Sequence, residues 1–167
     1  MAEVKNWYAL YTKPRHEFKA ELQLVSVGIT TYLPSVQKVR QWSDRKKKIT
    51  EPVLRGYIFI HATESERLEA LEQSSILRCV FDHGRPAAIP EWQIDNLRKM
   101  LEYRADYFVK EGLVTGTKVE ITDGPFAGVT GIVQSSIEGK TIAVSIELLN
   151  RSVIAYLTKD SILRVIE

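Results

Sequence analysis

The chain has 167 residues and a net charge of +2; 44% of its residues are hydrophobic and 26% are charged, which indicates a soluble globular protein of one or two domains. Its apolar runs are far shorter than the ~20 residues that cross a bilayer, and no signal-type apolar stretch follows residues 1–5, so we expect a cytoplasmic protein without a membrane segment. A single cysteine, Cys79, excludes an internal disulfide and a cysteine zinc site, and its apolar neighbours favour a place in the core over a reactive thiol.

The first predicted elements are a strand and a helix. Aromatic and aliphatic residues alternate over 4–11 and predict a strand. Thr12 and Pro14 then supply an N-cap and a first-turn proline for a helix that ends at Gly28. The predicted core-facing stripe of this helix has helical spacing and consists of Phe18, Leu22 and Val25.

Further strands and helices follow up to about residue 105. Runs that favour β-structure predict strands over 29–39, 53–61 and 76–81, with a short extended piece over 86–89. A short helix is predicted over 65–73, and Pro90 opens a last helix whose apolar positions are Trp92, Ile94, Leu97 and Leu101. This order predicts an α+β fold in which helices cover a mostly antiparallel sheet.

The remaining residues predict a small all-β domain. The short polar segment 105–112 is a candidate linker. Beyond it, turn signals separate five runs that favour strands, over 118–121, 130–137, 142–148, 152–157 and 162–165, which is typical of a small five-stranded barrel. Gly124 and Pro125 form a tight corner, with Phe126 capping the open end of the barrel, and Gly139-Lys140-Thr141 is predicted as a hairpin turn rather than a phosphate-binding loop.

Positive charge is concentrated in an arm over 40–51 and just before it. Residues 38–48 carry a local charge of +5, from one acid, Asp44, and six bases: Lys38, Arg40, Arg45, Lys46, Lys47 and Lys48. Trp42 lies among these bases, where it is suited to stacking on an unpaired base or lying along a nucleic-acid backbone. A solvated loop is the alternative. The segment from Leu113 onward has a charge of −1, which favours a protein-docking module over a phosphate-binding one.

No pattern in the sequence indicates catalysis. The three histidines, at positions 16, 61 and 83, are scattered and lack the spacing to acids that a metal site would show. Ser74-Ser75 lacks the glycines of a nucleophile elbow, and nothing places paired carboxylates in one pocket. We therefore expect a protein that is not an enzyme and that uses neither a cofactor nor a metal.

Three motifs occur in a characteristic order. The first is the aromatic strand Trp7-Tyr8-Ala9-Leu10-Tyr11-Thr12-Lys13, and the second, after the basic arm, is Pro52-Val53-Leu54-Arg55-Gly56-Tyr57-Ile58-Phe59-Ile60. The third, over 116–133, has glycines at 116, 124, 128 and 131 and resembles a KOW motif. As a set they resemble the NusG family of transcription factors over nearly the whole chain. The resemblance implies an N-terminal NGN-type α/β sandwich over 1–104, a linker over 105–112 and an SH3-like KOW barrel over 113–167.

The resemblance also implies a function in transcription elongation and antitermination. In the family, the N-terminal domain binds RNA polymerase at the clamp and suppresses pausing or termination, and the KOW domain recruits a partner. The polymerase-binding positions would fall on Tyr11, Leu54, Tyr57, Phe81, Ile94 and Leu97. An apolar patch with aromatic anchors suits such docking, although each residue alone is equally well explained as core. Leu10-Tyr11-Thr12-Lys13 and the short linker are more similar to the specialised paralogues of the RfaH and UpxY type than to the general factor.

The resemblance implies that the protein is a monomer that binds nucleic acid and a further protein. The arm, together with Lys13, Arg15 and Lys19 at the start of the first helix, would meet upstream duplex DNA or the non-template strand. No base specificity is implied, because Ser74 stands where one family reader has an arginine. A ribosomal protein or a termination factor would contact an exposed Leu149 in the loop 148–151. The alternative is a KOW-containing ribosome-associated or RNA-binding protein, which predicts a basic KOW segment.

Overall fold

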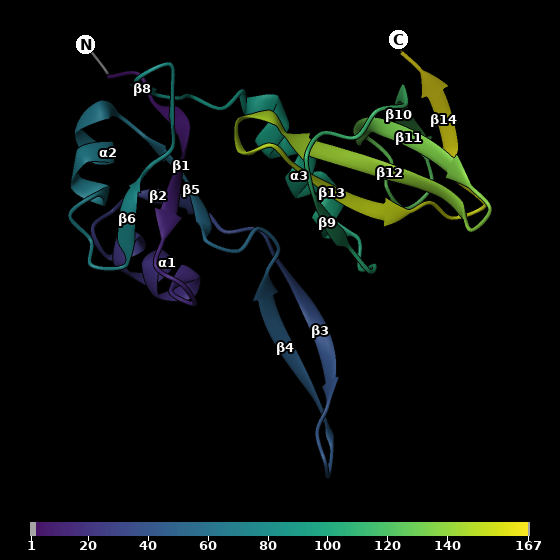
Figure 1. Cartoon of the computed structure of the whole chain (residues 1–167), viewed down its shortest axis with the longest axis horizontal. Helices are drawn as coiled ribbons and strands as arrows, with labels where there is room; N and C mark the ends of the chain where they lie inside the picture. The colour runs from purple at the N-terminus through teal and green to yellow at the C-terminus, as the bar shows by residue number, and fades with distance from the viewer. Residues whose placement is uncertain (1–2, 167) are drawn as a thin grey trace. The chain divides into compact units, whose positions relative to one another are not determined.

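The computed structural model describes residues 3–166, which form two compact units, residues 3–91 and residues 92–166 (Figure 1). The fold is mixed α/β, with three helices and mainly antiparallel sheets in the described part of the chain. None of the helices in residues 3–166 has the length and apolar character needed to cross a membrane.

The first unit is built on a four-stranded antiparallel sheet of order β2-β5-β1-β6. Its strands are β1 (Asn6–Thr12), β2 (Thr30–Tyr32), β5 (Tyr57–Ala62) and β6 (Ile76–Cys79). The central pair β1 and β5 runs in register from Asn6 opposite Ala62 to Tyr11 opposite Tyr57. Two very short strands, β7 (Phe81–Asp82) and β8 (Arg85–Pro86), pair with each other beyond the sheet. The predicted strand 29–39 is therefore split, because Leu33 and Pro34 separate β2 from β3 (Ser35–Gln41).

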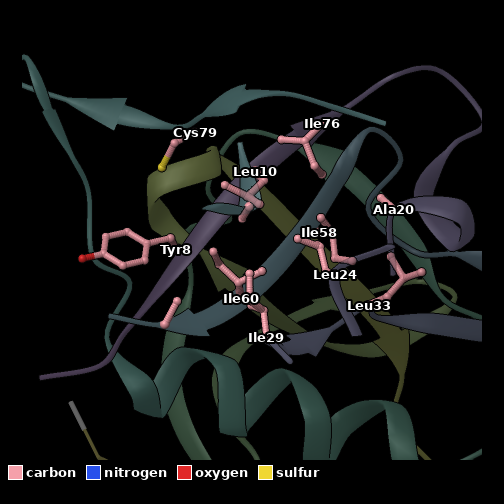
Figure 2. Close-up of a cluster of buried hydrophobic side chains, with 12 residues drawn as sticks. Tyr8, Leu10, Ala20, Leu24, Ile29, Leu33, Ile58, Ile60, Ile76 and Cys79 are labelled. Atoms are coloured by element: carbon pink, nitrogen blue, oxygen red, sulfur yellow. The ribbon is translucent and has the colours of Figure 1, made fainter. Parts of the chain in front are cut away.

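One face of this sheet carries the hydrophobic core of the first unit (Figure 2). Tyr8 and Leu10 of β1 lie opposite Ile60 and Ile58 of β5, so these four side chains share a face. Helices α1 (Glu17–Ser26) and α2 (Glu64–Ala70) contribute further buried residues to the cluster, including Leu24. Cys79 is buried in the same cluster, which confirms its predicted place in the core, and burial raises the pKa of its thiol.

The predicted inner stripe of α1 is wrong. Phe18, Leu22 and Val25 are exposed, Leu22 to 71%, whereas Ala20 and Leu24 are fully buried. The small Ala20 side chain lets the helix approach the sheet closely, so the face with Ala20 and Leu24 turns inward rather than the face with the larger residues. The helix also begins later than predicted, because His16 N–H bonds to the Lys13 carbonyl in a turn.

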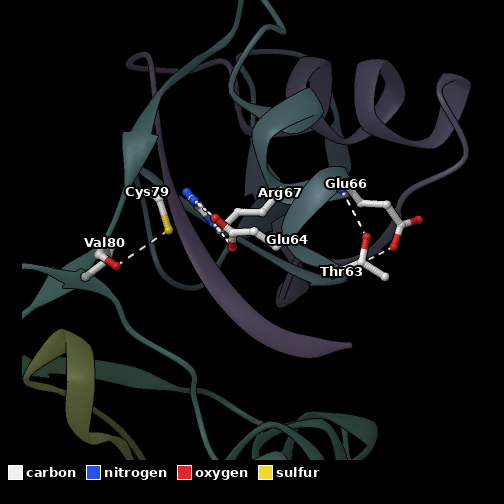
Figure 3. Close-up of polar contacts among 6 residues, drawn as sticks. All are labelled: Thr63, Glu64, Glu66, Arg67, Cys79 and Val80. Atoms are coloured by element: carbon white, nitrogen blue, oxygen red, sulfur yellow. Dashed lines mark hydrogen bonds and ion pairs between the residues drawn. The ribbon is translucent and has the colours of Figure 1, made fainter. Parts of the chain in front are cut away.

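Helix α2 is fixed at its start by reciprocal hydrogen bonds (Figure 3). Thr63 Oγ1 accepts from the Glu66 backbone N–H at 3.1 Å, and Thr63 N–H donates to Glu66 Oε1 at 2.9 Å. One turn on, the buried Arg67 guanidinium donates to both carboxylate oxygens of Glu64, which lowers the pKa of that carboxyl. The Arg67 guanidinium also lies over the Tyr8 ring, 5.9 Å from its centre, and so connects α2 to the sheet.

Thr63→Ala should lower the stability of the first unit by about 1 kcal/mol, because the Glu66 N–H loses its capping acceptor. Urea unfolding followed by circular dichroism measures the change. The matched control is Ser65→Ala on the exposed side of the same turn, which should change stability by less than about 0.5 kcal/mol. An equal loss in the two variants would show that the cap contributes nothing.

The second unit joins a helix to a six-stranded antiparallel sheet. Helix α3 (Glu91–Glu102) precedes the sheet, whose order is β14-β10-β11-β12-β13-β9. The strands are β9 (Phe108–Glu111), β10 (Thr117–Asp123), β11 (Thr130–Ser136), β12 (Gly139–Ile146), β13 (Arg151–Tyr156) and β14 (Ile162–Val165), with a short 3-10 helix η1 (Glu147–Leu149) before β13. A hairpin is present, but its turn is at residues 137–138, and Gly139-Lys140-Thr141, the predicted turn, already belongs to β12, with Gly139 paired with Ser136.

One strand of the second unit differs from the sequence prediction. The segment 105–112 contains β9, which pairs with β13 and adds a sixth strand to the five predicted.

Phe126 is fully buried, as a capping residue should be, and packs edge-on against the rings of Tyr103 and Tyr107. The Tyr107 hydroxyl donates to the Met100 carbonyl at 2.7 Å, and burial raises its pKa to about 12. These contacts hold the chain after α3 against the corner at 124–126.

Candidate functional site

The basic arm is an antiparallel hairpin formed by β3 and β4 (Lys46–Pro52), which projects away from the other elements of the first unit in Figure 1. Directly opposed residues share one face of such a pair. Arg40 and Lys47 oppose each other on one face, whereas Lys46 and Lys48 lie on the other. Positive charge is therefore present on both faces of the hairpin.

One acid near the base of the hairpin compensates two of its bases. Glu51 Oε1 accepts from Arg40 Nη2 at 2.5 Å, and Glu51 Oε2 lies 3.7 Å from Lys38 Nζ. The Arg40 hydrogen bond and the nearby positive charges lower the pKa of the Glu51 carboxyl. Within residues 3–166, no ion pair joins the four bases at 45–48 to an acid. The uncompensated charge is therefore at the arm tip, which we define as residues 42–48.

An aromatic residue lies within this charged tip. Trp42 is 46% exposed, and the Lys47 ammonium lies over its ring, 5.0 Å from the centre. The Trp42 backbone N–H donates to the Arg45 carbonyl at 2.7 Å and closes the turn. The tip thus presents an indole and several cations together, the combination that single-stranded nucleic acids favour.

The other predicted nucleic-acid residues lie at the start of α1. Lys13, Arg15 and Lys19 are all exposed. Arg15 has a φ of 64°, in the left-handed region that few side chains other than Asn and Asp adopt. Arg15 and Glu51 line the same groove, so Arg15 lies near the base of the arm. Of these three residues, the structure therefore places Arg15 beside the arm.

A polar network ties the same helix to the residues that precede β6. Gln23 Nε2 donates to Ser74 Oγ at 2.9 Å, and Gln23 Oε1 accepts from the Ser75 N–H at 3.1 Å. His16 Nδ1 lies 3.1 Å from Ser75 Oγ. Ser74 is thus engaged by Gln23, and these contacts orient the surface beside α1.

The second face of the four-stranded sheet is aromatic. Trp7 stacks on His61 at 5.0 Å between ring centres, and Tyr11 lies 5.2 Å from Tyr57 on the neighbouring strand. The Arg78 guanidinium lies over the Tyr11 ring at 4.7 Å. Tyr11 and Tyr57, two of the predicted polymerase-binding residues, are half-buried and adjacent, so they form a single surface.

The other four predicted polymerase-binding residues are not part of that pair. Leu54 is buried before β5, and its carbonyl accepts from the Tyr57 N–H at 3.3 Å. Phe81 is 54% exposed on β7. Ile94 and Leu97 belong to α3 and have no exposed surface. Of the six residues, only Tyr11, Tyr57 and Phe81 keep appreciable accessible surface.

Helix α3 is hydrogen-bonded to the sheet of the second unit. The Asn96 side chain bonds to both backbone groups of Thr130: Nδ2 donates to the carbonyl at 2.5 Å and Oδ1 accepts from the N–H at 2.8 Å. Gln93 Oε1 accepts from the Glu147 N–H at 3.3 Å. Both side chains are buried. The helix is therefore attached to two separate parts of the sheet by polar contacts as well as by packing.

The predicted exposure of Leu149 is wrong. Leu149 is only 5% exposed, because it lies in η1 and the loop closes over it. Asn150 adopts a φ of 52°, and Arg151 Nη1 donates back to the Leu149 carbonyl at 3.0 Å. Leu149 is therefore not accessible to a partner in this arrangement, and Leu148 is only half-buried.

No group of three or more metal-ligating side chains is present in the part of the chain that the structure describes. The titratable groups with shifted pKa values have structural explanations, namely ion pairs, a helix cap or burial. The arrangement offers binding surfaces, one basic and one aromatic.

Comparisons with known proteins decide the family. The model of the family described as "Transcription termination factor nusG" matches residues 5–98, more than half of the chain. The chain belongs to the NusG family. Family members are transcription factors rather than enzymes, and membership implies a role in transcription elongation.

Solved structures agree on the fold of this NusG-family chain. The structure entitled "Domain interaction in Thermotoga maritima NusG" has a TM-score of 0.50 and 20% identity, and the match covers 98% of each chain. Two structures of the MjSpt4:Spt5 complex, conformations B and A, have TM-scores of 0.36 and 15% identity, over 95% of this chain and 97% and 98% of theirs. Scores that low do not bear on the fold. No curated protein matches the chain significantly.

Several residues of this NusG-family chain were missed by sequence reasoning. Glu51 compensates part of the arm, Arg78 covers Tyr11, and Asn96 attaches α3 to the sheet. Glu51 could have been found from the sequence, since it is the acid at the end of the basic run. Arg78 and Asn96 could not, because their partners are distant in sequence.

Proposed function

We propose that the protein is a transcription elongation and antitermination factor that binds RNA polymerase at the clamp through its first unit and suppresses pausing or termination. The observation that carries the proposal is the adjacent, half-buried pair Tyr11 and Tyr57 on one face of a NusG-family sheet. Aromatic side chains beside a polar rim are typical anchors of protein interfaces. Such binding would favour the closed clamp by differential affinity for the active state.

The basic arm gives this factor a second contact, with nucleic acid. The uncompensated bases of the arm tip would neutralise phosphates of upstream duplex DNA or of the non-template strand, and Trp42 would lie against a base or the backbone. Lys13, Arg15 and Lys19 would extend this contact towards α1. The arm would thereby lengthen the residence of the factor on the elongation complex.

Within the second unit, residues 113–167 are proposed to act as a KOW barrel that recruits another protein, such as a ribosomal protein or a termination factor. Its near-neutral charge supports protein docking and does not support the alternative of an RNA-binding or ribosome-associated protein. Because Leu149 is buried, the partner would use another part of this unit or require the loop 148–151 to open. A specialised role of the RfaH and UpxY type is part of the same proposal.

The buried α3 residues constrain polymerase docking. Ile94 and Leu97 contribute to docking only if their side chains become accessible. In the arrangement described, docking would rely on Tyr11, Tyr57 and Phe81, and the buried Leu54 would act only through its backbone hydrogen bond with Tyr57.

Tyr57→Ala should weaken binding to a purified elongation complex about 10-fold, because it removes one of two adjacent aromatic anchors. Leu68→Ala is the matched control, since Leu68 is an exposed apolar residue of α2 outside the proposed surface, and it should leave the affinity within about 2-fold. Biolayer interferometry with immobilised polymerase complexes measures both. Equal affinity of the two variants would show that the aromatic pair does not contribute to polymerase binding.

A run-off transcription assay through a terminator tests the activity itself. Added protein should increase the fraction of transcripts that pass the terminator. No increase, together with co-purification of ribosomal subunits in place of polymerase, would support the ribosome-associated alternative.

A further inference from the structure

Helix α1 carries an apolar stripe on the side that faces solvent. Phe18, Leu22 and Val25, which we call the outer stripe, follow one another at i, i+4 and i+7 and therefore lie on one helix face. Their exposed fractions are 38%, 71% and 57%. The residues that hold the helix on the sheet, Ala20 and Leu24, are fully buried in the core (Figure 2). The contact between α1 and the sheet therefore does not use the outer stripe.

The shape of the outer stripe fits another helix. Single exposed apolar side chains are ordinary on protein surfaces, whereas a contiguous apolar patch indicates an interaction site. Residues four and three apart on a helix are neighbours, so Leu22 lies against Phe18 on one side and Val25 on the other. The three side chains form one ridge, and such a ridge packs into the groove between two ridges of a second helix.

One end of the outer stripe opens into the groove at the base of the arm. This groove has a volume of about 530 Å³, and Phe18, Pro14 and Pro52 supply its apolar surface. Two of its charged residues, Glu51 and Arg55, pair with each other at 3.9 Å. The groove can therefore accept an apolar side chain at the end of a segment that lies along the stripe.

Two charges of opposite sign flank the outer stripe. Glu21 lies three residues after Phe18 and four before Val25, so it borders the stripe on one flank. Lys19 lies three residues before Leu22 and borders the other flank. Neither forms an ion pair within residues 3–166. Glu21 is half-buried, and this burial raises the pKa of its carboxyl, as expected where no cation lies beside it.

A second copy of the chain is a poor partner for this stripe. In an antiparallel helix pair with two-fold symmetry, equal flanks face each other, so Glu21 would face the Glu21 of the other copy and Lys19 its Lys19. In a parallel pair with coiled-coil packing, Glu21 would face Ser26 and form no ion pair. The two flanks therefore fit a different helix, one with the opposite charge on each side.

We propose that the outer stripe binds an amphipathic helix of a partner protein, with a basic residue of that helix against Glu21 and an acidic residue against Lys19. The contact covers about three helical turns, a size characteristic of a transient interface. Tyr11 and Tyr57 lie on the opposite face of the sheet, so this helix and polymerase do not compete for the same residues. Of the residues assigned to nucleic acid above, only Lys19 is shared.

Binding of synthetic helical peptides to the full chain tests the proposal. Each labelled peptide has about 20 residues, to favour the helix, and carries apolar side chains only at three positions spaced i, i+4 and i+7. The mixed peptide has lysines on one flank of these positions and glutamates on the other, whereas the acidic peptide has glutamates on both. One of the two directions in which the mixed peptide can lie places lysine against Glu21. Fluorescence anisotropy should show that it binds about 10-fold more tightly than the acidic peptide.

Three variants locate the peptide on the chain. Leu22→Ser should weaken binding of the mixed peptide about 10-fold, because it removes the centre of the stripe. Leu68→Ser, at an exposed apolar position of α2, is the matched control and should leave the affinity within about 2-fold. Glu21→Lys should reverse the preference, so that the acidic peptide binds about 10-fold more tightly than the mixed one. None of the three side chains is fully buried, so the melting temperatures should stay close to that of the wild type.

Four results would overturn the proposal. Affinities that do not respond to Leu22→Ser, or a preference that Glu21→Lys leaves unchanged, would place the peptides elsewhere on the chain. Failure of both peptides to bind at millimolar protein would exclude a helical partner of this charge pattern. Sedimentation of the wild type as a dimer that Leu22→Ser converts to a monomer would assign the stripe to a second copy. These measurements involve neither polymerase nor nucleic acid, so their failure leaves the proposed function standing.

Discussion

Changing Arg45, Lys46, Lys47 and Lys48 to glutamate should weaken binding to an elongation complex about 100-fold at low salt, because the four bases that lack an acidic partner become repulsive to phosphate. The slope of log affinity against log salt should also become less steep, by an amount that corresponds to about three to four phosphate contacts. Fluorescence anisotropy over a range of salt concentrations measures both quantities on a complex that carries labelled upstream DNA.

The control for this variant carries the same charge change on the second unit. Lys110, Lys118, Lys140 and Lys159 are exposed, and their reversal to glutamate should change the affinity little. Unchanged affinity and unchanged salt dependence in the arm variant would remove the arm from the interface. Reversing only Lys46 and Lys48, or only Arg40 and Lys47, then shows which face of the hairpin lies against nucleic acid.

Gly131→Ala should destabilise the second unit by about 2–3 kcal/mol, because an added methyl group has no room there. A Cβ at position 131 would lie 2.5 Å from the Ala143 carbonyl oxygen and 2.7 Å from Ile142 Cδ1. Backbone atoms of a paired strand cannot move aside without loss of the β11–β12 ladder. Urea unfolding of the full chain measures the loss as a shift of the transition midpoint.

Two variants calibrate this effect. Ser135→Ala lies in the exposed part of the same strand and should change stability by less than about 0.5 kcal/mol. Gly28→Ala meets no atom within 4 Å but adopts a φ of 81°, so its cost is limited to about 1 kcal/mol of backbone strain. A loss for Gly131→Ala no larger than for Gly28→Ala would contradict the steric explanation.

Much of the fold could be predicted from local patterns. The strand at 4–11 and the helix at 65–73 match β1 and α2 to within about three residues, because alternation and the helical spacing of Leu68 and Leu71 are local signals. The inner face of α1 could not be predicted, since it carries two apolar stripes and only contact with the sheet selects the one that contains Ala20. Strand β9 was missed because Phe108 and Val109 gain their partner from β13, more than 40 residues later.

The candidate sites show the same division. The arm was predictable because its charge is contiguous in sequence, and its hairpin pairing then separates the bases between two faces. The groove beside the start of α1 was not predictable, because its lining residues Thr12, Glu17 and Arg55 come together only after β1 and β5 have paired. Leu149 was predicted as an exposed partner contact only because it matches a family contact position. Such a match does not tell whether the loop closes over the side chain, and here it does.

The double hydrogen bond between Asn96 and Thr130 makes one backbone amide a spectroscopic reporter. The Thr130 N–H is held by a side chain of α3 rather than by a strand, so its exchange with solvent deuterium requires the helix to leave that position. Its exchange rate, compared with that of the neighbouring amides of β11, would give the free energy of separating α3 from the sheet. If RNA polymerase contacts Ile94 or Leu97, α3 must move away from the sheet. Exchange at the Thr130 amide should then become faster, whereas the other amides of β11 should keep their exchange rates.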